Sequence, residues 1–177
     1  MIINEETRLR EVIYEGRVLN YVVDTVSLPG NKTSTREMVL HPGGVGVLAV
    51  DYDGYAYLVE QFRKPYEKAI LEIPAGKRDK GEEPADCGKR ELTEETGLVA
   101  KEMISLGEFY PSVGYTNEII HLYFAKDFVC GTSNPDEDEY VDIVKIPFEK
   151  LFTMVMDGEI KDGKTIAAVL KAKNLME

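Results

Sequence analysis

The chain lacks several features that would assign it to other classes of protein. It has only two cysteines, Cys87 and Cys130, and neither lies in a CxxC or CxxH pattern, so both are expected to be reduced thiols of a cytoplasmic protein. No stretch approaches the length of a transmembrane helix, and the first residues, MIINEETRLREV, contain no apolar run. Neither a membrane span nor a signal peptide is therefore expected.

Basic residues are also scarce relative to acidic ones. Lysine and arginine number 21 against 32 aspartates and glutamates, and the net charge is −11. Nucleic-acid binding draws on lysine and arginine, so this chain is a poor candidate for it. The acidity fits a protein whose working positive charge arrives as a metal ion. At 177 residues and 44% hydrophobic content, the chain fits one domain with at most a small appendage.

The most informative stretch is residues 76–98, GKRDKGEEPADCGKRELTEETGL. Pro84 suits the first turn of a helix, and Gly97 suits the left-handed position just past a helix end. The sequence therefore predicts a helix over about residues 84–96. Gly88 in its middle costs roughly 1 kcal/mol against alanine, which indicates close packing against another element.

This predicted helix carries clustered carboxylates. Glu91 and Glu95 are four residues apart and share a face, with Glu94 beside them, and Arg90 is placed to bond Glu94. Clustered carboxylates repel one another, and Mg²⁺, which prefers oxygen ligands and works with substrate phosphates, removes that cost. A solvated acidic helix with ordinary ion pairs would explain the charges, but not the two terminal glycines and the spacing.

The stretch resembles the Nudix box, G-x5-E-x7-R-E-U-x-E-E-x-G-U with U aliphatic, and every fixed position matches. At about 6% usage per residue type, a chance match at a given start is on the order of 10⁻⁹. The resemblance implies a Nudix hydrolase, in which a loop–helix–loop carries Mg²⁺ ligands for cleaving a nucleoside diphosphate linked to another group.

The rest of the chain predicts an α/β or α+β domain with a mixed sheet between helices. Residues 10–41 indicate three strands, 44–51 a strand buried on both faces, and 55–63 a strand entered by a hairpin turn at Asp53-Gly54. Further strands are expected at 101–109, 118–126 and 141–146, and helices from Pro147 to Gly158 and over 165–175. We predict an N-terminal antiparallel segment at 1–41 and a Nudix domain at 42–177.

The chain is similar to one Nudix branch, the ADP-ribose pyrophosphatases, in TREMVLHPGGVGVLAV, VEQFRKPYEKAILEIPAGK, FYPSVGYTNE and DEDEYVDI. This resemblance implies hydrolysis of ADP-ribose to AMP and ribose 5-phosphate, with Mg²⁺ or Mn²⁺ as cofactor. It implies catalytic roles for Glu137, as general base, and for Glu94. It also implies metal ligands at Ala75 (backbone carbonyl), Glu91, Glu95 and Glu139, and substrate contacts from Arg17, Arg36, Glu37, Arg63, Ser112, Gly114 and Glu118.

Several of these positions have a plainer explanation from the residues alone. Arg36 and Arg63 could form ordinary surface ion pairs, and residues 136–139, DEDE, could be a solvated acidic loop. Glu72 points either toward the site or outward from its strand. His41 and His121 are expected to be structural.

One loop departs from the branch pattern. The family usually has Ser-Pro-Gly where this chain has Ser112-Val113-Gly114, so another nucleoside diphosphate sugar, such as GDP-mannose or UDP-glucose, remains an alternative substrate. A non-hydrolytic sensing module is a second alternative, although the box glutamates are all kept. The resemblance further implies a homodimer in which residues 10–41 help to wall the partner's active site. Three strands alone are too few to be stable.

Overall fold

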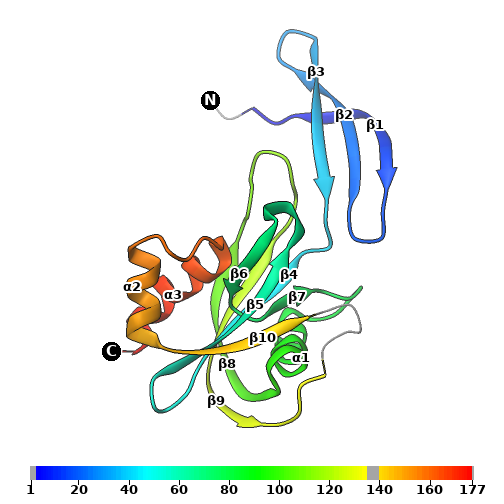
Figure 1. Ribbon diagram of the computed structural model, residues 1–177. Helices are drawn as coiled ribbons and strands as arrows, with labels where there is room; N and C mark the ends of the chain where they lie inside the picture. Colours follow the sequence, from blue (N-terminus) through cyan, green and yellow to red (C-terminus); the bar gives the residue numbers. More distant parts are fainter. Residues whose placement is uncertain (1–2, 135–139, 177) are drawn as a thin grey trace. The chain divides into compact units, whose positions relative to one another are not determined.

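The computed structural model describes residues 3–134 and 140–176, and its internal contacts divide the chain into two units. One unit comprises residues 1–43 and 110–119, and the other comprises 44–109 and 120–177. The elements, labelled in Figure 1, are β1 (Glu6–Glu15), β2 (Asn20–Leu28), β3 (Lys32–Leu40), β4 (Gly44–Val50), β5 (Tyr55–Arg63), η1 (Lys64–Tyr66), β6 (Lys68–Glu72), β7 (Ala75–Lys77), α1 (Pro84–Thr96), β8 (Leu98–Phe109), β9 (Ile120–Cys130), β10 (Val141–Pro147), α2 (Phe148–Met156) and α3 (Gly163–Met176). No helix in the described part of the chain is long and apolar enough to cross a membrane.

The first unit contains a three-stranded antiparallel sheet in the order β1-β2-β3. Its second turn, between β2 and β3, carries Gly30 and Asn31 with φ of 75° and 60°, a conformation that glycine and asparagine adopt most readily. Along β2, Val22, Asp24 and Val26 are buried in alternation, while every residue of β1 is exposed. The three predicted strands are confirmed, and the first begins earlier than predicted, at Glu6.

The second unit is built on a seven-stranded mixed sheet with the path β10-β5-β4-β9-β8. Strands β4 and β9 run parallel, and the other pairs are antiparallel. All seven residues of β4 are buried, as its continuous apolar run predicts for a central strand.

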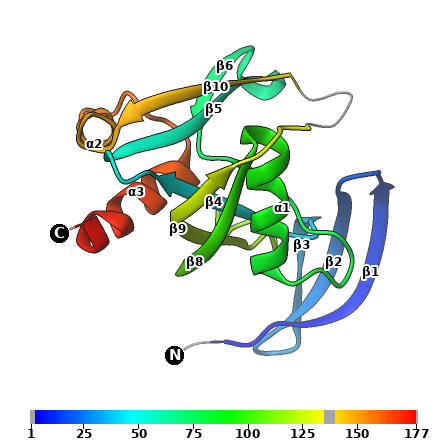
Figure 2. The ribbon, with the colours of Figure 1, turned by 90° about the horizontal axis from the view of Figure 1, so that it is seen from below.

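The alternation of β4 divides the core into two clusters. Val45, Val47 and Ala49 pack with Cys87 and Leu92 of α1 in one cluster. Leu48 and Val50, one step along the strand, pack in the other cluster with buried residues of α2 and α3. Successive strand residues point to opposite faces, so α1 covers one face and α2 with α3 the other (Figure 2). The predicted sheet between helices is confirmed.

Local signals set the ends of α1 where the sequence predicted them. Pro84 occupies the first turn, and Gly97 follows the last residue with φ of 72°, donating its N–H to the Thr93 carbonyl at 2.8 Å. The mid-helix Gly88 lies against β4: a Cβ added there would lie 3.0 Å from Val45 Cγ1 and 3.1 Å from Val47 Cγ2. The close packing inferred from this glycine is therefore confirmed.

We expect Gly88→Leu to lower the free energy of unfolding by about 2 kcal/mol, because overpacking a filled core forces side chains and backbone to shift. Urea denaturation measures the change. The matched control is Lys89→Leu, the next position on the same helix, which is exposed and should change stability by less than about 0.5 kcal/mol. Equal stability of the two variants would contradict the packing of α1 on β4.

Candidate active site

Arg90 bonds to carboxylates of α1 and of the loop that precedes this helix. Its Nε and Nη2 donate to the two carboxylate oxygens of Glu82 at 2.9 and 3.0 Å, and Nη2 also donates to the Lys77 carbonyl at 3.1 Å. Its Nη1 donates to Glu91 at 2.8 Å and to Glu94 at 2.9 Å. One guanidinium thus joins three carboxylates, a use that its planar five-donor geometry allows.

The predicted pair of Arg90 with Glu94 is confirmed, whereas the bonds to Glu82 and Glu91 were not predicted. Glu82 lies outside the helix, eight residues before Arg90, so helical periodicity does not bring the two together. The signal that could have indicated this contact was the fixed spacing of Glu82 and Arg90 in the Nudix box. The bonds from Arg90 hold the pKa of Glu82 at about 2, and the Glu82 carboxylate in turn raises the pKa of Arg90.

Glu91 and Glu95 form a buried pair of carboxylates against the loop before α1. Their exposed fractions are 8% and 2%. Glu95 accepts a hydrogen bond from the Ala75 N–H at 3.0 Å. A Cβ added to Gly76 would lie 1.9 Å from the Glu91 carboxyl carbon, so only glycine leaves room for that carboxylate. The sequence predicted the shared helix face but not this contact.

These residues offer the hard oxygen donors that Mg²⁺ and Mn²⁺ prefer. Glu91 and Glu95 supply carboxylates, and Ala75, whose N–H already binds Glu95, belongs to the adjacent peptide. Within residues 3–134 and 140–176, no three His, Cys, Asp or Glu side chains stand together as a finished metal site. The predicted base Glu137 and ligand Glu139 lie outside the described residues.

Arg63 and Glu72 form a second charged group in the same unit. Arg63 Nε and Nη2 donate to the two oxygens of Glu72 at 2.6 and 2.8 Å. Glu72 is only 3% exposed, so the outward alternative for this residue is wrong. Its burial would raise the pKa of Glu72, but the bonds from Arg63 and Lys164 outweigh burial and lower it.

The predicted substrate residues of the N-terminal segment lie in the first unit. Arg36 forms an ion pair with Glu5, through Nε at 2.8 Å and through Nη2, and also donates to Ser34. Its neighbour Glu37 leaves β3 on the opposite face, because strand side chains alternate. Arg17 is exposed in the turn between β1 and β2. Arg36 and Glu37 therefore point in opposite directions from β3.

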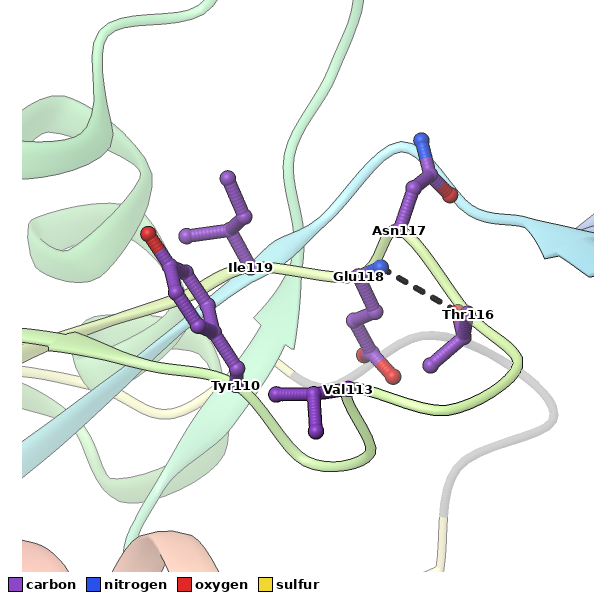
Figure 3. Close-up of a pocket in the computed structure, with 6 residues that line it drawn as sticks. All are labelled: Tyr110, Val113, Thr116, Asn117, Glu118 and Ile119. Carbon is purple, nitrogen blue, oxygen red and sulfur yellow. Dashed lines mark hydrogen bonds between the residues drawn. The ribbon is translucent and has the colours of Figure 1, made fainter. Parts of the chain in front are cut away.

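The loop 110–119 lines a cavity of about 280 Å³ (Figure 3). Its lining combines apolar and polar side chains: Tyr110, Val113, Thr116, Asn117, Glu118 and Ile119. In Figure 3 the Glu118 side chain extends toward Val113, which is 85% exposed. Ser112 and Gly114 lie on the same loop without lining the cavity.

The loop is attached to the end of β3. The Val39 N–H donates to the Tyr115 carbonyl at 2.7 Å, and the His41 N–H donates to Asn117 Oδ1 at 2.8 Å. The His41 ring lies 3.4 Å from the Glu118 carboxylate and accepts a bond from the Gly43 N–H. These bonds hold the cavity residues in place and fit the structural role expected of His41.

Comparison with known proteins identifies a family. The NUDIX domain family matches residues 40–169. An ADP-ribose pyrophosphatase of Bacillus subtilis is 43% identical over 169 residues, covering 94% of this chain and 91% of that protein. A methanol dehydrogenase activator of Bacillus methanolicus is 44% identical, covering 95% and 92%. A GDP-mannose pyrophosphatase of Yersinia enterocolitica is 34% identical, covering 82% of each.

A solved structure, described as an ADP compounds hydrolase, matches with a TM-score of 0.86 at 18% identity, covering 99% of this chain and 96% of the other. At that identity the match establishes the fold alone. It agrees with the mixed sheet and the N-terminal antiparallel strands described above.

We expect Gly76→Ala to lower turnover by about 10²-fold or more, because its Cβ would displace the Glu91 carboxylate, and the loss of metal-borne charge stabilisation costs several kcal/mol. Affinity for Mn²⁺, read by electron paramagnetic resonance, should fall as well. The control is Lys77→Ala, an exposed neighbour on the same short strand. Unchanged Mn²⁺ affinity in a folded Gly76→Ala variant would exclude Glu91 as a ligand.

Proposed function

This chain belongs to the Nudix family, and on that premise we propose that it hydrolyses the diphosphate bond of ADP-ribose to AMP and ribose 5-phosphate. The observation that carries the proposal is the buried pair Glu91 and Glu95 beside Ala75 and Gly76. Cleaving a diphosphate requires neutralisation of its charge at a fixed place, and these residues form a fixed binding site for a cation. The name of the Bacillus subtilis relative supports ADP-ribose as the substrate.

The proposed cofactor is Mg²⁺, with Mn²⁺ as the alternative. Glu91, Glu95, Glu139 and the Ala75 carbonyl would hold it, since all four supply the oxygen ligands that such ions prefer. When bound, the ion supplies neutralisation of the diphosphate and activation of water. The contribution of the protein is to fix the donors: Arg90 orients Glu91 and Glu94, and the Ala75 N–H orients Glu95.

The proposed catalytic carboxylates are Glu137, as the general base that accepts a proton from water, and Glu94. The role of Glu137 rests on the resemblance of its loop to the branch pattern. Glu137→Gln should lower kcat strongly with little change in KM, as expected for a group that acts in the transition state. If Glu139→Gln behaves in that way instead, the assignment within the loop is off by two residues.

The proposed substrate contacts fall into two groups. Arg63 would donate to a phosphate oxygen, which suits the planar guanidinium. The others would contact the nucleotide or the terminal ribose. They are Arg17, Arg36, Glu37, Ser112, Gly114 and Glu118.

The main alternative is hydrolysis of another nucleoside diphosphate sugar. The Yersinia enterocolitica relative carries the name of a GDP-mannose pyrophosphatase, and UDP-glucose is chemically equivalent at the diphosphate. Val113, exposed at the cavity, replaces the usual proline of the branch. A non-hydrolytic sensing module remains the least favoured alternative, because a sensor has no need of buried carboxylates such as Glu91 and Glu95.

We also propose a homodimer, supported by the exposed edge strand β1. Four large apolar side chains of this strand are 54–60% exposed, namely Leu9, Val12, Ile13 and Tyr14, and unpaired apolar edges favour pairing with another chain. In the proposed dimer this segment walls the partner's active site. A cytoplasmic location is proposed as well, because Cys87 and Cys130 are both free thiols; cell fractionation tests it.

Co-expression of an Arg36→Ala subunit with a Glu95→Gln subunit tests the shared site. Each homodimer should be nearly inactive, but the mixed dimer should regain activity, because one of its two composite sites is wild type. Light scattering checks the oligomeric state. Full activity in a monomer, or no recovery in a verified mixed dimer, would exclude a shared site.

A substrate panel with Mg²⁺ tests the reaction itself. We expect ADP-ribose to be cleaved with a kcat/KM at least tenfold above GDP-mannose and UDP-glucose, with AMP and ribose 5-phosphate resolved by chromatography. Glu95→Gln, which keeps the shape of the side chain, should lower turnover by about 10²-fold or more. GMP as the fastest-formed product would select the GDP-mannose alternative, and tight binding without any product would select the sensing module.

A further inference from the structure

A cluster of charged residues joins the start of α3 to Glu72 and Ile73, which precede β7. Asp162 caps the helix by accepting the Thr165 N–H at 3.0 Å and the Thr165 hydroxyl at 2.5 Å. The Thr165 oxygen in turn accepts the N–H of Ile73 at 2.8 Å. Ile73 lies two residues before Ala75, so the helix start is fastened directly to the chain that leads into the site.

Lys164 occupies the centre of this cluster. It is 8% exposed, and its ammonium group bonds to a Glu72 oxygen and lies 3.1 Å from Asp162 Oδ1. A lysine is rarely buried unless it is paired, and here it faces two carboxylates. The residue lies 92 positions from Glu72 along the chain, and neither the Nudix box nor the proposed substrate contacts include it.

Glu72 bonds to both Lys164 and Arg63 and so links the two cations. Both Glu72 oxygens receive donors from Arg63, which leaves the Nη1 edge of the guanidinium directed away from Glu72. The bonds to Glu72 chiefly raise the pKa of Arg63, and the charges of Asp162 and Glu95 add to the rise. Nη1 is the edge with which Arg63 would donate to a phosphate oxygen of the substrate.

The charges of the cluster balance only if Lys164 is present. Glu72 and Asp162 contribute two negative charges, and Arg63 and Lys164 contribute two positive ones. Without the ammonium group the carboxylates would outnumber the cations, and the field around Arg63 would become negative. A negative field at low local dielectric opposes binding of a diphosphate, so Lys164 removes an electrostatic penalty beside Arg63.

We propose that Lys164 is a positioning residue for the substrate diphosphate, acting through Glu72 to hold Arg63 in orientation and offsetting the second carboxylate charge of the cluster beside it. This inference rests on the proposed function, since it takes Arg63 as a residue that contacts the substrate phosphate. It adds a residue of α3 to the proposed site residues of β5, β7 and α1.

A double-mutant cycle of Lys164→Met and Arg63→Ala tests the proposal. Lys164→Met alone should raise KM for ADP-ribose by about tenfold, the effect expected of lost binding, with a smaller change in kcat. In the Arg63→Ala background the same substitution should change KM by less than about twofold, because its target is gone. Equal effects in both backgrounds would overturn the proposal.

Thr165→Val is the matched structural control. It removes the hydroxyl bonds to the Ile73 N–H and to Asp162 at the same helix start and leaves the four charges intact. We expect a lower Tm with KM unchanged within about twofold, whereas a merely structural role of Lys164 predicts that Thr165→Val raises KM as much as Lys164→Met. If Lys164→Met does not fold, Lys164→Gln, whose amide still donates to Glu72 without the charge, replaces it in the cycle.

Calorimetry with the non-hydrolysable α,β-methylene analogue of ADP-ribose separates this inference from the proposed function. Binding of the analogue with no hydrolysis of ADP-ribose by the wild-type chain would reject the proposed function, and the cycle is then completed on Kd. If the wild-type chain hydrolyses ADP-ribose but the effects of Lys164→Met and Arg63→Ala are additive, only the role of Lys164 is rejected. If the wild-type chain neither binds the analogue nor hydrolyses ADP-ribose, both the proposed function and the role of Lys164 are rejected.

Discussion

The structure depends on one constraint, the burial of two carboxylates on a single face of α1. Glu91 and Glu95 cannot be removed from water as isolated charges without a large cost. The chain compensates in three ways: Arg90 donates to Glu91, the Ala75 N–H donates to Glu95, and Gly76 leaves out the side chain that would collide with Glu91. The residues of the Nudix box therefore stabilise buried carboxylates as well as supplying the proposed metal ligands.

The position of α1 depends in turn on β4. This strand is buried along its whole length and turns alternate residues to opposite sides. One side receives α1 through Gly88, whose missing side chain allows contact with Val45 and Val47. The other side receives α2 and α3. A rigid central strand therefore supports both the helix that carries the box and the helix that begins at Asp162 and Lys164.

The two charged clusters of the second unit share a design. In each, an arginine bonds to carboxylates: Arg90 to Glu82, Glu91 and Glu94, and Arg63 to both oxygens of Glu72. Guanidinium groups hold their charge at any physiological pH and fix planar geometry. Such pairs contribute less to stability than to orientation, since burying the partners offsets much of their attraction. The orientation of acidic and basic groups is what the proposed hydrolysis requires.

The sequence by itself determined the long strands, the helices and the shared helix face, whereas the short strands β6 and β7 were not predicted. Pro84 and Gly97 bounded α1, the apolar run of β4 specified a central strand, and Glu91 with Glu95 followed from a spacing of four, because these signals act within a few residues. Tertiary structure alone decided that Gly76 meets Glu91, that Glu82 folds back onto Arg90, and that Lys164 reaches Glu72. Those contacts join residues from 8 to 92 positions apart. Their geometry depends on how loops and helices pack on the sheet, which no local periodicity encodes.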